Sequence, residues 1–158
     1  FGTIGLLGLI GILALVPPRI RNIRGADKNQ TMANLNRIKV VVAEYRNNWG
    51  LPESMEDLVS AKGGLNPAFA KNKLHPNLEI GYFCAAPDPV LADQYPNEAV
   101  LIVSFAKKGV DGRAVLLYSG KSDKWFKDKE FEELMSHEVN LEFAKRLAEA
   151  EANLGKGD

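Results

Sequence analysis

The stretch LNRIKVVVAEYRNNW, residues 35–49, carries one line of apolar residues at alternating steps of three or four positions. Such spacing places its members on a single face of an α-helix. The members of this apolar seam are Leu35, Ile38, Val42, Tyr45 and Trp49. Charged and amide residues fill most of the positions between them. The pattern predicts a helix whose seam packs on the rest of the chain and which ends at Gly50 and Pro52.

Toward the N-terminus, the sequence predicts that the same helix extends back to residue 19. Residues 19–34 contain no proline and only one glycine, Gly25. They are mostly polar, and they lack the seam found after Leu35. The sequence therefore predicts an amphipathic stem over residues 19–50. We expect its polar first half to be solvated or buried against other subunits, without a packing partner inside a small domain.

The first sixteen residues, FGTIGLLGLIGILALV, contain no charge. A helix of this length spans about 24 Å, somewhat less than the roughly 30 Å of a bilayer core. A segment that is apolar on all sides is surrounded by lipid or by protein. It lacks the positive start and small-x-small cleavage site of a signal peptide. Pro17 and Pro18 predict a helix break where it ends.

Glycine recurs every third residue in this segment, at positions 2, 5, 8 and 11. Small residues in membrane helices let neighbouring backbones approach closely. The stripe formed by Gly5, Gly8 and Gly11 therefore favours a helix–helix packing face. Glycine is also simply frequent in membrane helices, and this second explanation stays open.

The remainder of the chain reads as a globular head. Ser54 begins a short helix that Gly63 and Gly64 end. Strand-like runs follow at 78–86, 99–108 and 113–120, with a possible short fourth strand at 124–126. Short links favour an antiparallel sheet. One face of this sheet would bury the seam, giving a two-layer core. One or two helices end the chain.

The predicted fold class is therefore α+β, with a long N-terminal helix packed on a small antiparallel sheet and a helix at the C-terminus. We divide the chain into four parts. They are an apolar helix over 1–18, the stem over 19–50, the head over 51–137, and a C-terminal helix and tail over 138–158.

Charge is balanced overall but not along the chain. The 158 residues carry 20 Lys/Arg and 20 Asp/Glu, which argues against a globally basic nucleic-acid-binding protein. Residues 1–50 have a net charge of +5 and the rest a net charge of −5. The two halves could attract each other between copies of the chain, or they could be ordinary solvated surface.

Catalytic and metal-binding patterns are weak. The single cysteine, Cys84, lies in an apolar run and is predicted to be a buried, inert thiol. His75 and His137 stand in no recognisable nucleophile arrangement. There is no phosphate-binding loop and no zinc or haem pattern. The acidic loop from Asp88 to Glu98 fits no calcium template. We predict no catalytic residue, metal or cofactor, and a protein that is not an enzyme.

Taken together, these marks resemble the type IV pilin and pseudopilin family. Family members begin with phenylalanine, commonly as FTLIEL, and Phe1, Ile4, Leu6 and Leu7 match in place. The stretch EYRNNWGLPESMEDLVS is similar to the end of the family's stem. The family's positions there are occupied by Tyr45, Gly50, Pro52 and Leu58. The run GRAVLLYSGKSDKWF resembles the strand–turn–strand that ends many pseudopilin heads. Gly5 stands where the family usually has glutamate.

The resemblance implies a subunit processed by a prepilin peptidase, with Phe1 as the new and often methylated N-terminus. It would wait in the inner membrane and then be moved by pilus or secretion machinery into an extracellular helical filament of identical copies. The filament core would be formed by Ile4, Gly5, Leu6, Leu7, Gly8, Gly11 and Leu13.

Two alternatives remain at this point. The first is a pseudopilin of a type II secretion system, which has the same fold but forms a short periplasmic filament. The second is a membrane-tethered binding domain or enzyme that stays monomeric. Neither alternative involves nucleic acid.

Overall fold

The computed structural model describes residues 18–156, with side chains from Gly25 onward. The predictions for Phe1, Pro17 and the proposed filament-core residues lie outside the described residues. These filament-core residues are Ile4, Gly5, Leu6, Leu7, Gly8, Gly11 and Leu13.

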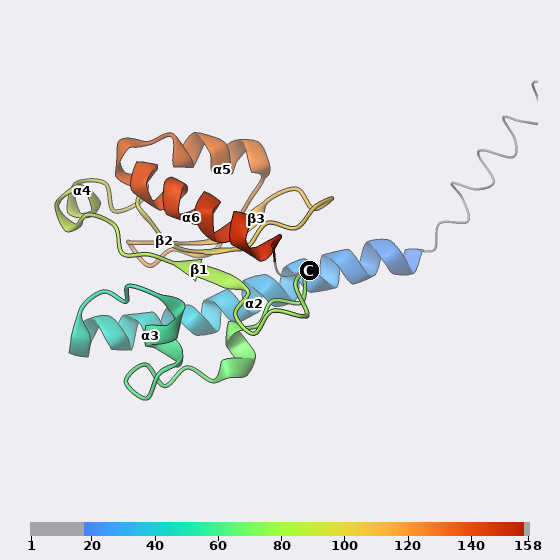
Figure 1. Cartoon of the computed structure of the whole chain (residues 1–158), viewed down its shortest axis with the longest axis horizontal. Coiled ribbons are helices and arrows are strands. Elements are labelled where there is room, and N and C mark those ends of the chain that lie inside the picture. Colours follow the sequence, from blue (N-terminus) through green and yellow to red (C-terminus); the bar gives the residue numbers. More distant parts are fainter. Residues whose placement is uncertain (1–17, 157–158) are drawn as a thin grey trace, which may run out of the picture.

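Helix α2 dominates the described chain. It runs without interruption over Pro18–Trp49, 32 residues, as the sequence predicts for the stem. Figure 1 shows its first turns extending beyond the strands, and its later turns lying along them. Among the described helices, none is long and apolar enough to cross a membrane.

A four-stranded antiparallel sheet forms the centre of the structure, in the order β1-β2-β3-β4. Its strands are β1 Tyr82–Cys84, β2 Val100–Ser104, β3 Arg113–Leu117 and β4 Trp125–Phe126. The four predicted runs contain them, although each strand is shorter than its run. Between Val100 and Ile102 the register shifts, so Leu101 is an extra residue in β2, as in a β-bulge.

The link between β2 and β3 requires glycine at position 112. Gly112 has φ +106°, and a Cβ placed there would lie 2.2 Å from the carbonyl oxygen of Phe126. Its amide donates to Asp128 Oδ1 at 2.8 Å. This turn therefore joins β3, β4 and the start of the following helix at one corner of the sheet.

Helices surround the sheet on both faces. After α2 come α3 Met55–Val59, the 3-10 helix η1 Pro67–Ala70, and α4 Pro89–Gln94. The chain ends in α5 Asp128–Met135, the 3-10 helix η2 Glu138–Asn140, and α6 Leu141–Leu154. Helix α4 lies in a segment without a predicted helix; Asp88 caps its first turn by accepting from the amide of Leu91.

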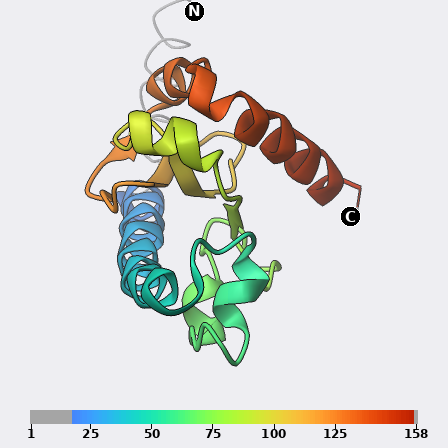
Figure 2. The ribbon, with the colours of Figure 1, turned by 90° about the vertical axis from the view of Figure 1, so that its left-hand side faces the viewer.

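The core is built in three layers, so the two-layer prediction is wrong. One face of the sheet packs against α2 and α3. The other face packs against α5 and α6, which contribute Phe131, Phe143 and Leu147. Figure 1 shows the strands between these helical layers, and Figure 2 shows α2 and α6 well apart. Because α6 shares this core, we use the name head below for residues 51–156.

Candidate functional site

The site predicted for the described chain is the contact between α2 and the head. Leu35, Ile38 and Val42 are buried, at 0, 0 and 4 % exposure. They share one cluster with side chains from three strands, among them Tyr82, Cys84, Leu101, Ile102, Ala114 and Leu116. Tyr45 is half-buried and packs on the same cluster. The middle of the predicted seam therefore lies on the sheet.

The end of the predicted seam, at Trp49, does not pack on this cluster. Trp49 is 56 % exposed, which corrects its assignment to the packed line. The helix ends at this residue, and Gly50 turns the chain with φ +89°. Leu51 packs on the cluster instead. The ammonium of Lys62 lies 4.8 Å from the Trp49 ring centroid.

The polar half of α2 also contacts the head, contrary to the expectation that it has no packing partner there. Thr31 and Asn34 are buried, at 0 and 5 % exposure. The Thr31 hydroxyl lies 2.7 Å from the Asp27 carbonyl oxygen and 2.9 Å from Asn72 Oδ1. Asn34 Nδ2 donates to the carbonyl of Lys71 at 3.0 Å. The sequence shows Thr31 and Asn34 as polar, but not that the head supplies their partners.

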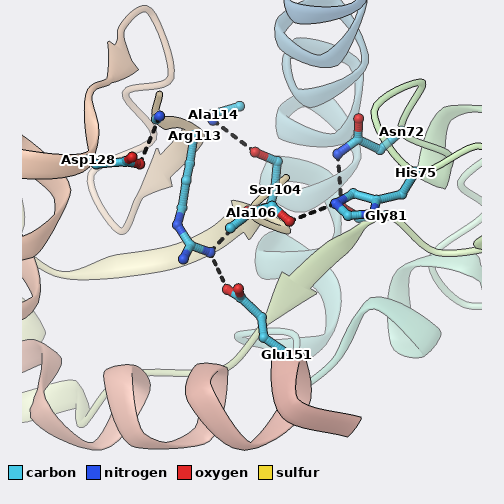
Figure 3. Close-up of polar contacts among 10 residues, drawn as sticks. Asn72, His75, Gly81, Ser104, Ala106, Arg113, Ala114, Asp128 and Glu151 are labelled. Atoms are coloured by element: carbon cyan, nitrogen blue, oxygen red, sulfur yellow. Dashed lines mark hydrogen bonds and ion pairs between the residues drawn. The ribbon is translucent and has the colours of Figure 1, made fainter. Parts of the chain in front are cut away.

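Asn72 organises this polar contact. It is 1 % exposed, and its Oδ1 accepts from the amide of Leu74 as well as facing Thr31. Its Nδ2 donates to the carbonyl of Gly81, shown in Figure 3. The hydroxyl of Tyr82 donates to the main-chain carbonyl of Thr31 at 2.8 Å. Buried polar groups are tolerated when hydrogen-bonded, so this network fixes where α2 lies along the head.

Several cations of α2 lie over aromatic rings of the head. Lys28 lies 4.8 Å from the Trp125 centroid, and Arg37 lies 4.3 Å from that of Phe69. Cation–π contacts of this kind are favourable. The charge of each cation is not neutralised by them, because the partner is a ring and not a carboxylate.

Arg46 is held in the same way at the other end of the contact. Its guanidinium carbon lies 4.5 Å from the Tyr118 centroid, and its Nη1 donates to the Tyr118 carbonyl at 2.6 Å. The Tyr118 hydroxyl donates to Asp93 at 2.6 Å. This hydrogen bond to a carboxylate raises the pKa of Tyr118.

A shallow groove lies beside Arg46, between α2 and the end of β3. Its volume is about 480 Å³. Lys39, Ala43, Arg46 and Asn47 line one wall, and Tyr118 to Gly120 line the other. The groove is thus basic along its helical wall.

The opposite face of the sheet has its own polar contacts. Arg113 on β3 forms an ion pair with Glu151 on α6, shown in Figure 3. The Arg113 guanidinium also lies 4.5 Å from the Phe131 centroid. Asn140 is fully buried; its Oδ1 accepts from Val100 N, and its Nδ2 donates to the carbonyls of Glu98 and Leu134. Sequence reasoning missed both Asn72 and Asn140, because their side chains bond to main-chain groups that no spacing pattern marks.

The groups considered for catalysis each make contacts within the fold. Cys84 is buried, as predicted, and burial raises the pKa of its thiol. His75 Nε2 lies 2.9 Å from the carbonyl oxygen of Ala106 (Figure 3). The Nδ1 of His137 accepts from the amide of Val139 at the start of η2. Within residues 18–156, no cluster of three or more His, Cys, Asp or Glu residues is arranged to hold a metal ion.

The contact between α2 and the head therefore has two parts, a polar part around Thr31 and an apolar part around Ile38. We call these two parts together the two-part seat. Comparisons with protein-family models, curated proteins and solved structures find no match for this chain.

Proposed function

We propose that this chain is the structural subunit of a pilin-like extracellular filament, polymerising through its N-terminal apolar segment. The observation that carries the proposal is the continuity of α2. One helix begins at Pro18, directly after the apolar segment in the sequence, and continues to Trp49 on the head. A helix with this arrangement links an apolar element to a globular head without a flexible joint between residues 18 and 49.

The two-part seat supports the same proposal. A subunit that is pulled from a membrane into a filament must transmit force from its stem to its head. The buried hydrogen bonds of Thr31, Asn34 and Tyr82 and the apolar contacts of Leu35, Ile38 and Val42 attach α2 over three turns. Such an attachment resists sliding of the helix along the head, because sliding would leave buried polar groups without partners.

The outer side of α2 is suited to contacts with other helices. One exposed line on it, formed by Ala33, Val40, Ala43 and Asn47, carries no charge, and the charged residues Arg37, Lys39 and Glu44 are exposed beside this line. Heterologous contacts between identical subunits generate open helical filaments when the rotation does not close.

The direct test is electron microscopy of the full chain purified from a membrane, before and after dilution of detergent. Filaments are the expected result. Short assemblies that do not grow into long filaments would favour the type II secretion pseudopilin, and a persistent monomer would overturn the proposal. Mass spectrometry of the N-terminus is expected to find a methylated Phe1 amine.

A second test uses the glycine stripe. Gly8→Leu and Gly11→Leu each add a bulky side chain where close helix packing is proposed, and each is expected to reduce filament yield. Leu9→Ile is a matched control that keeps the segment apolar and leaves the stripe intact. Normal filaments from both glycine variants would contradict packing through the stripe.

A further inference from the structure

Charged residues are sorted along the length of α2. We call the part of the head beside the first half of α2 the near end, and it comprises residues 71–79, 105–113, 124–130 and 151–156. We call the opposite part the far end, and it comprises residues 51–64, 85–98, 117–123 and 133–142. In Figure 1 the near end lies on the side where α2 begins, and α4 and the start of α6 mark the far end.

Two contacts attach the near end to the first half of α2. Asn34 Nδ2 donates to the carbonyl of Lys71 at 3.0 Å. The ammonium of Lys28 lies 4.8 Å from the centroid of the Trp125 ring. The segments that contain Lys71 and Trp125 therefore lie beside the same stretch of helix.

Further contacts join the other segments of the near end. His75 Nε2 lies 2.9 Å from the carbonyl oxygen of Ala106. A depression of about 320 Å³ is lined by His75, by Lys107 and Lys108 of the link between β2 and β3, and by Leu154 at the end of α6. Segments that are far apart in sequence thus form one surface beside the first half of α2.

The near end is strongly basic. It carries nine Lys/Arg and five Asp/Glu, and residues 18–28 of α2 add four Lys/Arg and one Asp. The thirteen basic and six acidic residues give a net charge of +7. Seven lysines of the near end are exposed, and among the described residues none of them forms an ion pair; they are Lys71, Lys73, Lys107, Lys108, Lys127, Lys129 and Lys156.

The acidic residues of the near end have partners of their own. Two of the five form the ion pairs with Lys124 and Arg113. The side chains of Asp111 and Asp128 each accept a hydrogen bond from a main-chain amide. Within the described chain, only Glu79 has neither kind of contact. All five are included in the count above, so the excess of positive charge remains after every acidic residue is considered.

The far end has the opposite sign. It carries ten Asp/Glu and only two basic residues, Lys62 and Lys121, which gives a net charge of −8. The last turns of α2 beside it add Glu44 and Arg46, which cancel. Eight of the ten acidic residues are exposed. An anionic partner would therefore attract one end of the molecule and repel the other.

The position of the near end identifies the anionic partner. The uncharged segment over residues 1–16 directly precedes α2 in the sequence, so a membrane that holds this segment faces the near end. Lys28 follows Pro18 by ten residues, which is about 15 Å along a helix. A headgroup layer is about 5–8 Å thick, and charges act over about 8 Å beyond it at physiological salt. The near end thus lies within reach of headgroup charge, and a modest tilt of α2 brings its lysines into contact.

We propose that the near end docks on an anionic phospholipid surface while the apolar segment over residues 1–16 lies in the bilayer. The exposed lysines of the near end contact the headgroups, and the acidic far end points away from the membrane. The link between β2 and β3, which carries Lys107 and Lys108, extends toward the side of the first turns of α2 (Figure 1). The inference rests on the proposed function and deepens it, because it names what the head contacts before the subunit enters a filament.

The closing experiment measures how close each end lies to a membrane. The full chain is reconstituted in vesicles of phosphatidylcholine, with or without phosphatidylglycerol, that contain an acceptor dye on lipid headgroups. A donor dye is attached to Asn77→Cys at the near end or, as the matched control, to Val90→Cys at the far end; both positions are exposed. Cys84 is buried, and the parent chain measures any labelling of this thiol.

Energy transfer from position 77 is expected to rise on the order of twofold when phosphatidylglycerol is present and to fall back at high salt. Transfer from position 90 is expected to show no rise. The apolar segment is the same in both labelled chains, so its insertion cannot produce this difference.

Charge reversal provides an independent test. The pair Lys107→Glu and Lys108→Glu is expected to abolish most of the rise at position 77. The pair Lys62→Glu and Lys121→Glu makes the same change in net charge at the far end and is expected to leave the rise intact. All four lysines are exposed, and circular dichroism verifies that each variant is folded.

The outcomes separate this inference from the proposed function. Equal transfer from position 77 in the two lipid compositions would overturn the docking, and filaments formed by such a chain would leave the filament proposal standing. A lipid-dependent rise without filaments would support the docking and count against the filament. Equal losses from the two pairs of lysine substitutions would overturn the docking, because they would show a response to net charge alone. Transfer between position 77 of one copy and position 90 of another, without dependence on lipid, would also overturn it, because the near end would then contact the far end of a second copy.

Discussion

The two faces of the central sheet are covered by helices of different origin. One face receives α2, which ends 33 residues before β1 begins and whose first turns extend past the head (Figure 1). The other receives α5 and α6, which follow β4 directly. Both faces combine an apolar cluster with a buried asparagine from the chain after residue 50, Asn72 on one face and Asn140 on the other. The chain after residue 50 thus covers one face of the sheet by itself, whereas cover of the other face depends on α2.

The largest expected effect tests the apolar part of the α2 face. Leu35→Ala removes a fully buried side chain and is expected to lower the free energy of unfolding by about 3 kcal/mol. Val40→Ala on the exposed side of the same helix is expected to change it by less than about 0.5 kcal/mol. Urea unfolding followed by circular dichroism measures both. Equal losses from the two variants would mean that α2 does not bury this side on the sheet.

The next prediction compares two of the buried asparagines, Asn72 and Asn140. Asn72→Ala leaves the amide of Leu74 without its partner and removes the contacts of Asn72 with the Thr31 hydroxyl and the Gly81 carbonyl. Asn140→Ala leaves the amide of Val100 and the carbonyl of Glu98 without their side-chain partner. We expect each to cost about 1–3 kcal/mol in the free energy of unfolding. Hydrogen exchange should locate the first loss at α2 and the second at α5 and α6.

Asn48→Ala is the control for both substitutions, because Asn48 is exposed and bonds only to the Glu44 carbonyl one turn away. It should be nearly neutral in the same unfolding measurement. An Asn72→Ala variant as stable as this control would show that the polar part of the seat contributes nothing.

Alkaline pH should weaken the α2 face selectively. Burial raises the pKa values of Tyr82 and Cys84, both of which lie in the cluster under α2. The ordinary pKa values are about 8.5 for Cys and about 10 for Tyr. Below these values both groups are neutral in the folded and the unfolded chain, so their full contribution to the free energy of unfolding is present. That stability is lost as the pH rises through the raised values, because the unfolded chain releases these protons first.

The measurement is urea unfolding at a series of pH values from 7 to 11. The free energy of unfolding is expected to decline above about pH 9. Tyr82→Phe should start lower, because it loses the hydrogen bond to Thr31, but should decline less steeply. Parallel curves for the two proteins would contradict a role for Tyr82 in the decline.

The smallest effects concern the ion pairs of the opposite face. Glu151→Gln weakens the half-buried pair with Arg113 and is expected to cost about 1 kcal/mol. Glu130→Gln affects the more exposed pair with Lys124, and we expect no measurable shift in the unfolding midpoint. Thermal melts at low and high salt would test the ranking, which fails if Glu130→Gln is the more harmful change.

Periodicity predicted most of the α2 face. The three- and four-residue steps from Leu35 to Val42 mark a buried helical line, and the apolar runs containing Tyr82, Ile102 and Leu116 mark strands. Periodicity could not place Trp49, because the helix end and the turn at Gly50 decide its exposure.

The opposite face was harder to predict from local patterns. The unbroken run from Val100 to Ser104 is buried on both sides, and such a run is typical of a strand covered on two faces. This signal was present in the sequence but does not say which helices form the second cover. The partners of Thr31 and Asn140 are main-chain and amide groups from distant segments. Only the tertiary fold brings these groups together.

The order of segments along the chain has a consequence for synthesis. An isolated helix forms within about a microsecond, whereas contacts between residues far apart in sequence form much more slowly. Ile38 packs in the same cluster as Leu116, which is synthesised 78 residues later. The sheet face that buries Ile38 therefore cannot form until Leu116 has been made. The newly made α2 therefore emerges from the ribosome with its apolar seam bare, and a chaperone or a translocation factor has time to engage it before the head folds.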